Sequence, residues 1–429
     1  GSEMFIRDRH RSIGYVRLIT ACCVFAGFSL CSTAQASSLT LGAAEELALA
    51  SDPGVQSVEA NKLALEELSV AADQLPDPLL KMGLVSLPTD TFNLGQEAMT
   101  QVQVGVIQKF PRGQSRSLRS AQTGLKSESL DEVARDKELQ IRLSVREQYL
   151  EVLKQRELAR INAEAISALS DVADITREYY ATGRVHQQDV LQASVELAKV
   201  EDRAARIAQD EEQARTRLAT WAGEAAYRDL DRSWPQFGPR QSADAIKDKL
   251  LDHPRIRALQ KNISAAETGV ELAKQRYKPE FALDVTYGGR GGTNPDGSSR
   301  TDLLTLMVVM DVPLFTKNRQ DRVVAAQVAE SSAVTYMRDD ILRMMRSEVD
   351  YHVATHDRQQ ERIQLFESTL LPEAEFSSDA SLEAYQSSIQ DLTTLLRTRI
   401  TEFDLQLEHA RLQAEVLKTQ ARLHYLEGV

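Results

Sequence analysis

The chain has only three cysteines, Cys22, Cys23 and Cys31, and all of them lie in the first 36 residues. Beyond residue 36 there is therefore no thiol for a disulfide, a nucleophile or a thiolate metal site. The same part of the sequence contains no apolar run of about 18 residues, which excludes a transmembrane helix there. If this part of the protein enters a membrane, it must do so as strands.

Enzyme motifs are also missing. The sequence has no glycine-rich phosphate loop, no GxSxG turn and no HExxH pair, so we expect no catalytic residues and no cofactor. Acidic residues outnumber basic ones by 63 to 51. Without residues 1–36, which hold four basic and two acidic side chains, the counts are 61 and 47 and the formal charge is -14. This charge excludes nucleic acid as an expected partner.

Residues 1–36 have the pattern of a segment that is removed on export. Gly1-Ser2-Glu3 precede a methionine and are interpreted as a vector-derived remnant. Four arginines then lead into the apolar run 18–30, as in a secretory signal peptide. Ala34-Gln35-Ala36 fits cleavage before Ser37, whereas the lipoprotein-like stretch 19–22 comes too early in the apolar run. We therefore expect simple cleavage; whether the N-terminus is lipidated stays open.

Two parts of the remaining sequence copy one another in layout. Asp52-Pro53 is expected to begin a helix that Pro78 ends, and His253-Pro254 and Pro279 do the same 201 residues later. Two further pairs of matching segments, later in the two parts, are separated by 202 and 205 residues. We therefore predict a first structural repeat at 37–222 and a second at 244–429. The segment 223–243, with Trp234-Pro235 and Gly238-Pro239, is expected to be an equatorial linker.

Each repeat contains a stretch in which apolar residues recur at every second position. This pattern predicts a β-hairpin at about 79–110 and another at about 280–312. In 101–106, valines alternate with Gln101, Gln103 and Gly105. An apolar face opposite a polar one suits a lipid-facing barrel with a wet interior. The residues expected on the lipid face are Val102, Val104, Val106, Phe281, Leu283, Val285, Leu304, Leu306 and Val308. A soluble sandwich or a cap on the helices is the alternative, but the export signal and the flanking helices favour the barrel.

The rest of the sequence is helical in composition and nearly free of proline. The stretch 114–182 is long enough for about 100 Å of helix, which no globular core could contain. Helical legs are expected to return along 186–222, and in the second repeat to run out along 317–385 and back along 389–426. Apolar residues at spacings of three and four on the first return leg, among them Val200 and Leu218, predict a coiled-coil seam.

Four strands cannot close a barrel in lipid, because an open edge would leave backbone groups without partners. Three copies would supply twelve strands, whereas two would give a barrel filled by its own side chains. The expected fold is therefore mainly α with a small β part: a duplicated helix-hairpin-helix whose homotrimer forms a 12-stranded outer-membrane β-barrel continued by a long periplasmic α-helical barrel.

The duplicated layout, the segment YYATGRVHQQDVL at 179–191, its partner YQSSIQDLTTLL at 385–396 and LLPEAE at 370–375 resemble the TolC-like outer-membrane efflux factors. The resemblance extends over essentially the whole chain after residue 36. LPDP at 75–78, Leu87-Pro88 and MTQVQVGVIQKFP at 99–111 are most similar to the heavy-metal branch of the cobalt-zinc-cadmium type. This resemblance implies a passive duct of a tripartite RND system in the outer membrane and periplasm of a Gram-negative bacterium. Its partners would be outer-membrane lipid, a periplasmic adaptor (membrane fusion) protein and an inner-membrane RND pump.

The resemblance also implies roles for the turns at the helix ends. By position, the following residues would form the periplasmic tip that contacts the adaptor: Thr182, Gly183, Arg184, Val185, Ser387, Ser388 and Ile389. Gly183 suits such a turn because glycine tolerates a positive φ. Family members can carry aspartates just after the second tip, where this sequence has Thr394 and Arg397. With Asp189 and Asp391 nearby, these positions are the candidates for a pore constriction.

His352 and His356 lie one helical turn apart on the same face as Met345 and could bind a passing cation. The better interpretation is that they are seam or surface histidines, because spacing supplies no third ligand. Two alternatives to metal export stay open: a multidrug or type I secretion channel, and, from another class, a soluble periplasmic coiled-coil adaptor or structural protein. The cargo, the gating mechanism and the identity of the pump and adaptor do not follow from the sequence.

Overall fold

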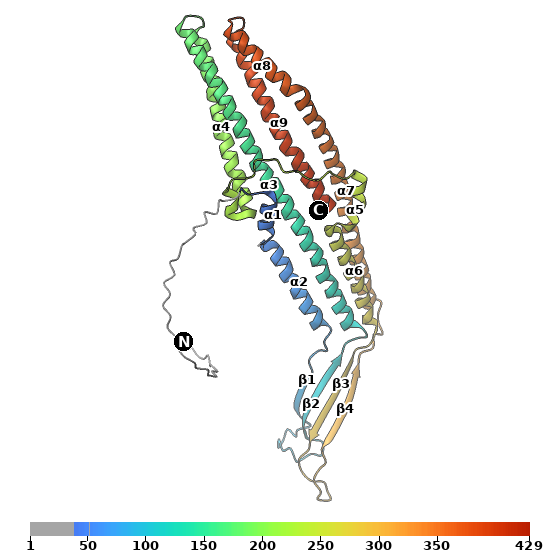
Figure 1. Ribbon diagram of the computed structural model, residues 1–429. Coiled ribbons are helices and arrows are strands. Elements are labelled where there is room, and N and C mark those ends of the chain that lie inside the picture. Colours follow the sequence, from blue (N-terminus) through green and yellow to red (C-terminus); the bar gives the residue numbers. More distant parts are fainter. Residues whose placement is uncertain (1–37, 51) are drawn as a thin grey trace, which may run out of the picture. The chain divides into compact units, whose positions relative to one another are not determined.

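The computed structural model describes residues 38–50 and 52–429 of the chain. The predicted signal peptide, its cleavage site and the three cysteines lie outside the described residues. The described part is mainly helical with one small sheet, as the sequence predicted (Figure 1). None of its helices is both long enough and apolar enough to span a bilayer.

The first half consists of short helices, a strand pair and a long helical hairpin. Its elements are α1 (Leu41–Ala50), α2 (Pro53–Ala72), β1 (Leu79–Val85), β2 (Gln101–Phe110), α3 (Ser115–Ala181), α4 (Gln187–Ala222) and the 3-10 turn η1 (Gly223–Tyr227).

The second half repeats this order of helix, strand pair and helical hairpin. Its elements are α5 (Ala243–Lys249), η2 (Leu250–Asp252), α6 (Pro254–Lys274), η3 (Gln275–Tyr277), β3 (Phe281–Gly289), β4 (Leu303–Met310), α7 (Gln320–Leu365), the π-helical turn η4 (Phe366–Leu370), α8 (Leu371–Gln386) and α9 (Leu392–Glu427).

Equivalent local signals begin the matched helices α2 and α6. Asp52 Oδ1 accepts the N–H of Val55 at 2.9 Å, and His253 Nδ1 accepts the N–H of Arg255 at 3.2 Å. A proline follows each of these caps at the first helical position, where its missing N–H costs nothing. The Asp-Pro and His-Pro pairs therefore fix where the two helices begin.

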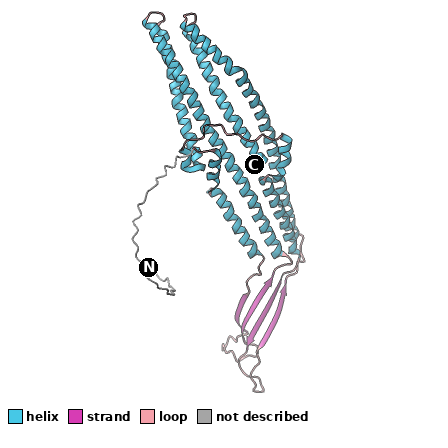
Figure 2. Cartoon of the chain, in the orientation of Figure 1, coloured by secondary structure: helices cyan, strands magenta, loops and turns pink. Residues whose placement is uncertain are grey.

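The four strands form one antiparallel sheet in the order β1-β2-β3-β4. β2 pairs with β3, so the sheet joins the two halves of the chain. Within the described residues, β1 and β4 each pair on one side only and form open edges. Figure 2 shows the strands at one end of the helices, while the turns between α3 and α4 and between α8 and α9 lie at the other end.

The helix α3 is the central helix of the bundle, since it packs against α2, α4, α6 and α9. The predicted seam on α4 faces it, with Ala193, Val200, Ile207, Ala214 and Leu218 all buried. Near the helix turns, a core of aliphatic and aromatic residues joins α3 and α4 to α8 and α9. Two further cores surround α1 and α5 at mid-length.

The outward leg of the second half, expected along 317–385, is not one continuous α-helix. It begins at Gln320 and is interrupted by the π-helical turn η4 just before Pro372. Proline has no N–H to donate, and its ring clashes with the carbonyl four residues earlier, so the helix widens ahead of it. The matched stretch of α3 contains no proline and runs unbroken.

Candidate functional site: the strand faces and the helix turns

One face of the sheet is apolar across all four strands. The cross-strand register aligns Leu80, Val106, Val285 and Leu306 in one row, and Met82, Val104, Tyr287 and Leu304 in the next. All nine residues expected to face lipid lie on this face, and their exposed fractions run from 36% for Val285 to 68% for Leu304 and Leu306. Nothing in the described chain covers them. A contiguous apolar surface of this kind marks a contact with membrane or with another protein.

The opposite face carries a polar cluster that spans three strands. Lys81, Gly105 and Thr286 stand in one row, and Lys81 Nζ reaches past the glycine to Asp284 Oδ2 at 2.9 Å. The Thr286 hydroxyl donates to the other carboxylate oxygen of Asp284 at 2.5 Å. A Cβ at position 105 would lie 2.9 Å from the carbonyl oxygen of Val285, so glycine leaves the room that the lysine uses.

The expected alternation of apolar and polar residues fails on β4. Its second face carries Leu303, Thr305, Met307 and Val309, and the three apolar members are exposed. The prediction of a polar face on every strand is therefore wrong for this one. β4 is an edge strand and has a neighbour on one side only.

The two helix turns have the same backbone construction. The N–H of Arg184 bonds to Tyr179 O at 2.8 Å, and that of Ile389 bonds to Ala384 O at 2.9 Å. Each turn contains one residue in the left-handed region, Gly183 at φ 74° and Ser388 at φ 57°. These are Schellman-type helix ends, which satisfy the last carbonyls of α3 and α8. Of the predicted tip residues only Val185 is half-buried, and Ile389 is 82% exposed.

The two turns are joined just behind their tips. The rings of Tyr179 and Tyr385 lie 5.7 Å apart, the Thr176 hydroxyl lies 3.3 Å from Tyr385 Oη, and the guanidinium of Arg184 covers the Tyr179 ring at 5.3 Å. A cavity of about 250 Å³ lies between the turns and is lined by residues of both, including Asp189 and Asp391. The sequence patterns did not indicate this joint, because the offset of the repeats relates equivalent residues of the two turns but does not show that their side chains touch.

The candidate constriction residues act as helix caps in the single chain. Asp189 Oδ2 accepts the N–H of His186 at 2.9 Å, and Asp391 Oδ1 accepts the N–H of Thr394 at 2.7 Å. The Thr394 backbone N–H and then its hydroxyl lower the pKa of Asp391, which keeps this carboxylate ionised. Arg397 is exposed one turn further along α9. These carboxylates are therefore engaged in starting α4 and α9.

The histidine pair lies against the second mid-length core. Met345 is buried there beside Val349 and Leu423, as a core residue would be. Burial and then Arg422 lower the pKa of His352, and burial and then Arg240 lower that of His356. Across the described residues, no three His, Cys, Asp or Glu side chains are grouped so that they could hold a metal ion.

Comparisons with known proteins agree with this architecture. Residues 245–429 match the family model described as outer membrane efflux protein. That family consists of channel proteins rather than enzymes. A comparison with curated proteins found no match.

Solved structures extend the likeness to both halves at the level of the fold. The outer-membrane channel OprN has a TM-score of 0.76 at 16% identity, over 90% of this chain and 89% of that one. The outer membrane protein VceC from Vibrio cholerae gives 0.76 at 17%, over 90% and 96%. CusC, described in connection with transmembrane channel formation, gives 0.75 at 13%, over 90% and 91%. The described chain thus has the same fold as these solved outer-membrane proteins.

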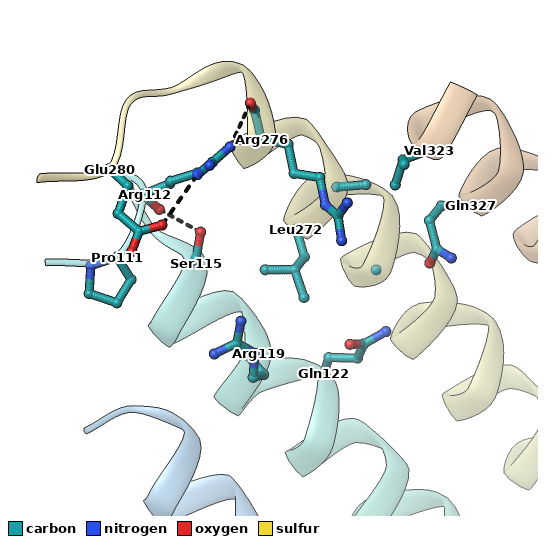
Figure 3. A pocket seen from close by; sticks show the side chains of 12 residues that line it. Pro111, Arg112, Ser115, Arg119, Gln122, Leu272, Arg276, Glu280, Val323 and Gln327 are labelled. Carbon is teal, nitrogen blue, oxygen red and sulfur yellow. Dashed lines mark hydrogen bonds and ion pairs between the residues drawn. The ribbon is translucent and has the colours of Figure 1, made fainter. Parts of the chain in front are cut away.

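A further feature lies where the strands meet the helices, and the sequence patterns did not indicate it. Arg112, Arg119 and Arg276 come together at a cleft between α3, α6 and α7 (Figure 3). Arg276 stands more than 150 positions from the other two, and the packing of α3 against α6 together with the pairing of β2 with β3 brings them close. No local pattern in the sequence indicates this convergence.

Proposed function

We propose that the protein is the outer-membrane channel subunit of an efflux system, and that three copies enclose one passive export duct. The observation that carries this proposal is the exposed apolar face that runs across all four strands. Fully burying a side chain such as Val or Leu is worth about 1.5 to 3 kcal/mol each. The bilayer core would cover this face, while the cluster around Lys81 and Asp284 would line the aqueous side.

The open edges of the sheet require neighbours. In lipid, every unpaired N–H or C=O of β1 and β4 would cost several kcal/mol, which pairing between copies removes. Three four-stranded sheets give a barrel of about twelve strands, wide enough for a channel, whereas two would be filled by side chains. The homotrimer is therefore the smallest assembly that closes the sheet around a duct.

The helices then extend away from the membrane into the periplasm. The 67 residues of α3 span about 100 Å at 1.5 Å per residue. At their far end the exposed turn residues Thr182–Val185 and Ser387–Ile389 would meet a periplasmic adaptor protein, which in turn joins an inner-membrane RND pump. The constriction would form where the α4 and α9 starts of three copies converge, with Asp189, Asp391, Thr394 and Arg397 around it.

For the cargo, we propose heavy-metal cations. Support comes from the resemblance of segments 75–78, 87–88 and 99–111 to the cobalt-zinc-cadmium branch. His352, His356 and Met345 would at most contact a passing ion weakly, and a duct does not need to hold its cargo. A multidrug or type I secretion channel is the alternative within the same class.

A soluble periplasmic coiled-coil protein is the alternative from another class, and the exposed apolar face argues against it. The two differ in fractionation. Release by osmotic shock would contradict the channel, whereas extraction by detergent alone and a heat-dependent shift in gel migration support it. Growth of a deletion strain on zinc, cobalt, cadmium, copper or silver, compared with growth on drugs and bile salts, then tests the cargo. Sensitivity to drugs alone would contradict metal export without contradicting the duct.

A further inference from the structure

A cleft of about 490 Å³ lies at the junction of strands and helices (Figure 3). Its walls come from the start of α3, the end of α6 and the start of α7, just beyond the ends of β2 and β3. Gly269 on α6 keeps it open, because a Cβ there would lie 2.7 Å from Gln122 Nε2 on α3 and 3.0 Å from Gln327 Oε1 on α7. A glycine inside a helix costs about 1 kcal/mol relative to alanine, and here the close approach of two amides accounts for it.

Three guanidinium groups line this cleft against one carboxylate. Arg112 is held in place: its Nε lies 3.6 Å from Glu280 Oε2, it pairs with Asp311, and its Nη1 donates to the carbonyl of Arg276 at 3.2 Å. Arg119 and Arg276 reach into the cleft from opposite walls. In the part of the chain that the structure describes, neither has a carboxylate within 4.0 Å. The cleft is thus a local positive site in a chain whose net charge is -12.

The cleft opens on the polar side of the sheet. Side chains at every second position of a strand share a face. Pro111 therefore follows on from the polar-face residues Gln103, Gly105 and Lys109 of β2. Glu280 likewise stands two positions before the first polar-face residue of β3. Both residues line the cleft. In the duct proposed above, this side faces the lumen, at the point where cargo passes from the helical barrel into the β-barrel.

We propose that this cleft binds an anionic group, a carboxylate or an oxyanion such as phosphate, and makes the entrance of the β-barrel favourable to anions. The inference rests on the proposed channel function. Arg119 and Arg276 offer planar N–H pairs that suit oxyanions. Three copies would place nine arginines around the lumen at one level. A metal ion would then pass this level more easily as an anionic complex than as a bare cation.

The test is the ion selectivity of the purified full-length assembly in a planar bilayer under a KCl gradient. Arg119→Gln with Arg276→Gln should raise the permeability ratio of potassium to chloride by about twofold or more, because the local potential falls. The matched control, Arg116→Gln with Arg322→Gln, removes the same charge from α3 and α7 at the same level, outside the cleft. It should change the ratio less. Arg119→Lys with Arg276→Lys keeps the charge and should retain the wild-type ratio.

Inorganic phosphate provides a second measurement on the same channels. It should reduce the wild-type conductance in a saturable manner, and more phosphate should be needed in the double glutamine variant. Wild-type channels whose selectivity and phosphate response match those of the glutamine variant would contradict the cleft and leave the duct intact. A wild-type protein with no conductance would contradict the proposed channel, and this inference with it.

Discussion

Gly183 and Ser388 occupy the same left-handed position in the two helix turns, at φ 74° and 57°. The hydrogen bonds around them match one for one, with the next residue's N–H returning to Tyr179 O in one turn and to Ala384 O in the other. The two repeats thus keep one backbone design with different side chains. Only one of the two positions carries the residue that tolerates this conformation without cost.

This relationship predicts opposite effects of substitution at the two turns. Gly183→Ala should destabilise its turn by about 1 kcal/mol, since a left-handed conformation costs a side chain about 1–2 kcal/mol. No atom lies within 4 Å of a Cβ there, so the effect would be conformational alone. Ser388→Gly should stabilise the other turn. Hydrogen exchange of the turn amides measures both; equal protection in the two variants would contradict the assignment.

Gly105 and Gly83 both lie on the polar face of the sheet, and Gly83 serves as the control position for Gly105. Gly105→Ala should destabilise the sheet by about 1–3 kcal/mol, because the new methyl group meets Thr286 and separates Lys81 from Asp284. Gly83→Ala adds the same group where nothing lies within 4 Å and should be neutral or slightly stabilising. Urea unfolding in detergent or lipid compares them. A similar loss of stability in both variants would contradict the claim that position 105 must be glycine to leave room for Lys81.

Charge on the two faces of β2 should have unequal effects. Val104→Lys places an ammonium on the apolar face, at an expected cost of about 2–4 kcal/mol near mid-bilayer. Gln103→Lys, at the neighbouring position of β2, places the same group on the polar face of the sheet and should be tolerated. The measurement is the free energy of unfolding in lipid vesicles. Equal costs for the two variants would argue against a lipid-facing side.

We expect His253 to make the free energy of unfolding of the helical part depend on pH. Its ring lies between the start of α6 and the end of α9: Nδ1 accepts from Arg255, and Nε2 lies 2.9 Å from Tyr425 O as a donor. Burial lowers the pKa of His253, so the unfolded chain takes up the proton first as the pH falls. The free energy of unfolding should therefore decrease below the ordinary histidine pKa of about 6.5.

His253→Asn keeps a capping side chain but removes this titration. The variant should lose less stability than the wild-type protein between about pH 7 and pH 5, whatever its stability at neutral pH. Chemical unfolding at a series of pH values measures the difference. Parallel pH profiles for the two proteins would contradict the role of His253.

Patterns local in sequence predicted the local structure. The valines at 102, 104 and 106 predicted a strand and its two faces, and Asp52-Pro53 and His253-Pro254 predicted the starts of α2 and α6. Such patterns depend only on neighbours a few residues apart. The same reasoning missed the π-helical turn before Pro372, because proline shows that a helix is disturbed but not how it adjusts.

Contacts between distant parts of the chain were not predictable in this way. The Tyr179–Tyr385 joint and the arginine cleft both depend on how the two repeats pack together. For the same reason, the candidate constriction residues could be placed on helices but not around a pore. Asp189 and Asp391 cap their own helices in the chain, and their position in a trimer stays a prediction.

The central claim is that copies of the chain close the sheet by pairing β1 of one with β4 of the next. Because no cysteine follows Cys31, a pair of introduced cysteines can report this contact directly. Gly83→Cys would be combined in turn with Leu303→Cys, Thr305→Cys and Met307→Cys, and oxidised in native membranes. We predict a ladder of crosslinked species that ends at three copies for at least one pair, and none when Gly83→Cys is combined with Leu306→Cys on the other face. Absence of crosslinks for every pair, in protein that fractionates without detergent, would contradict the claim.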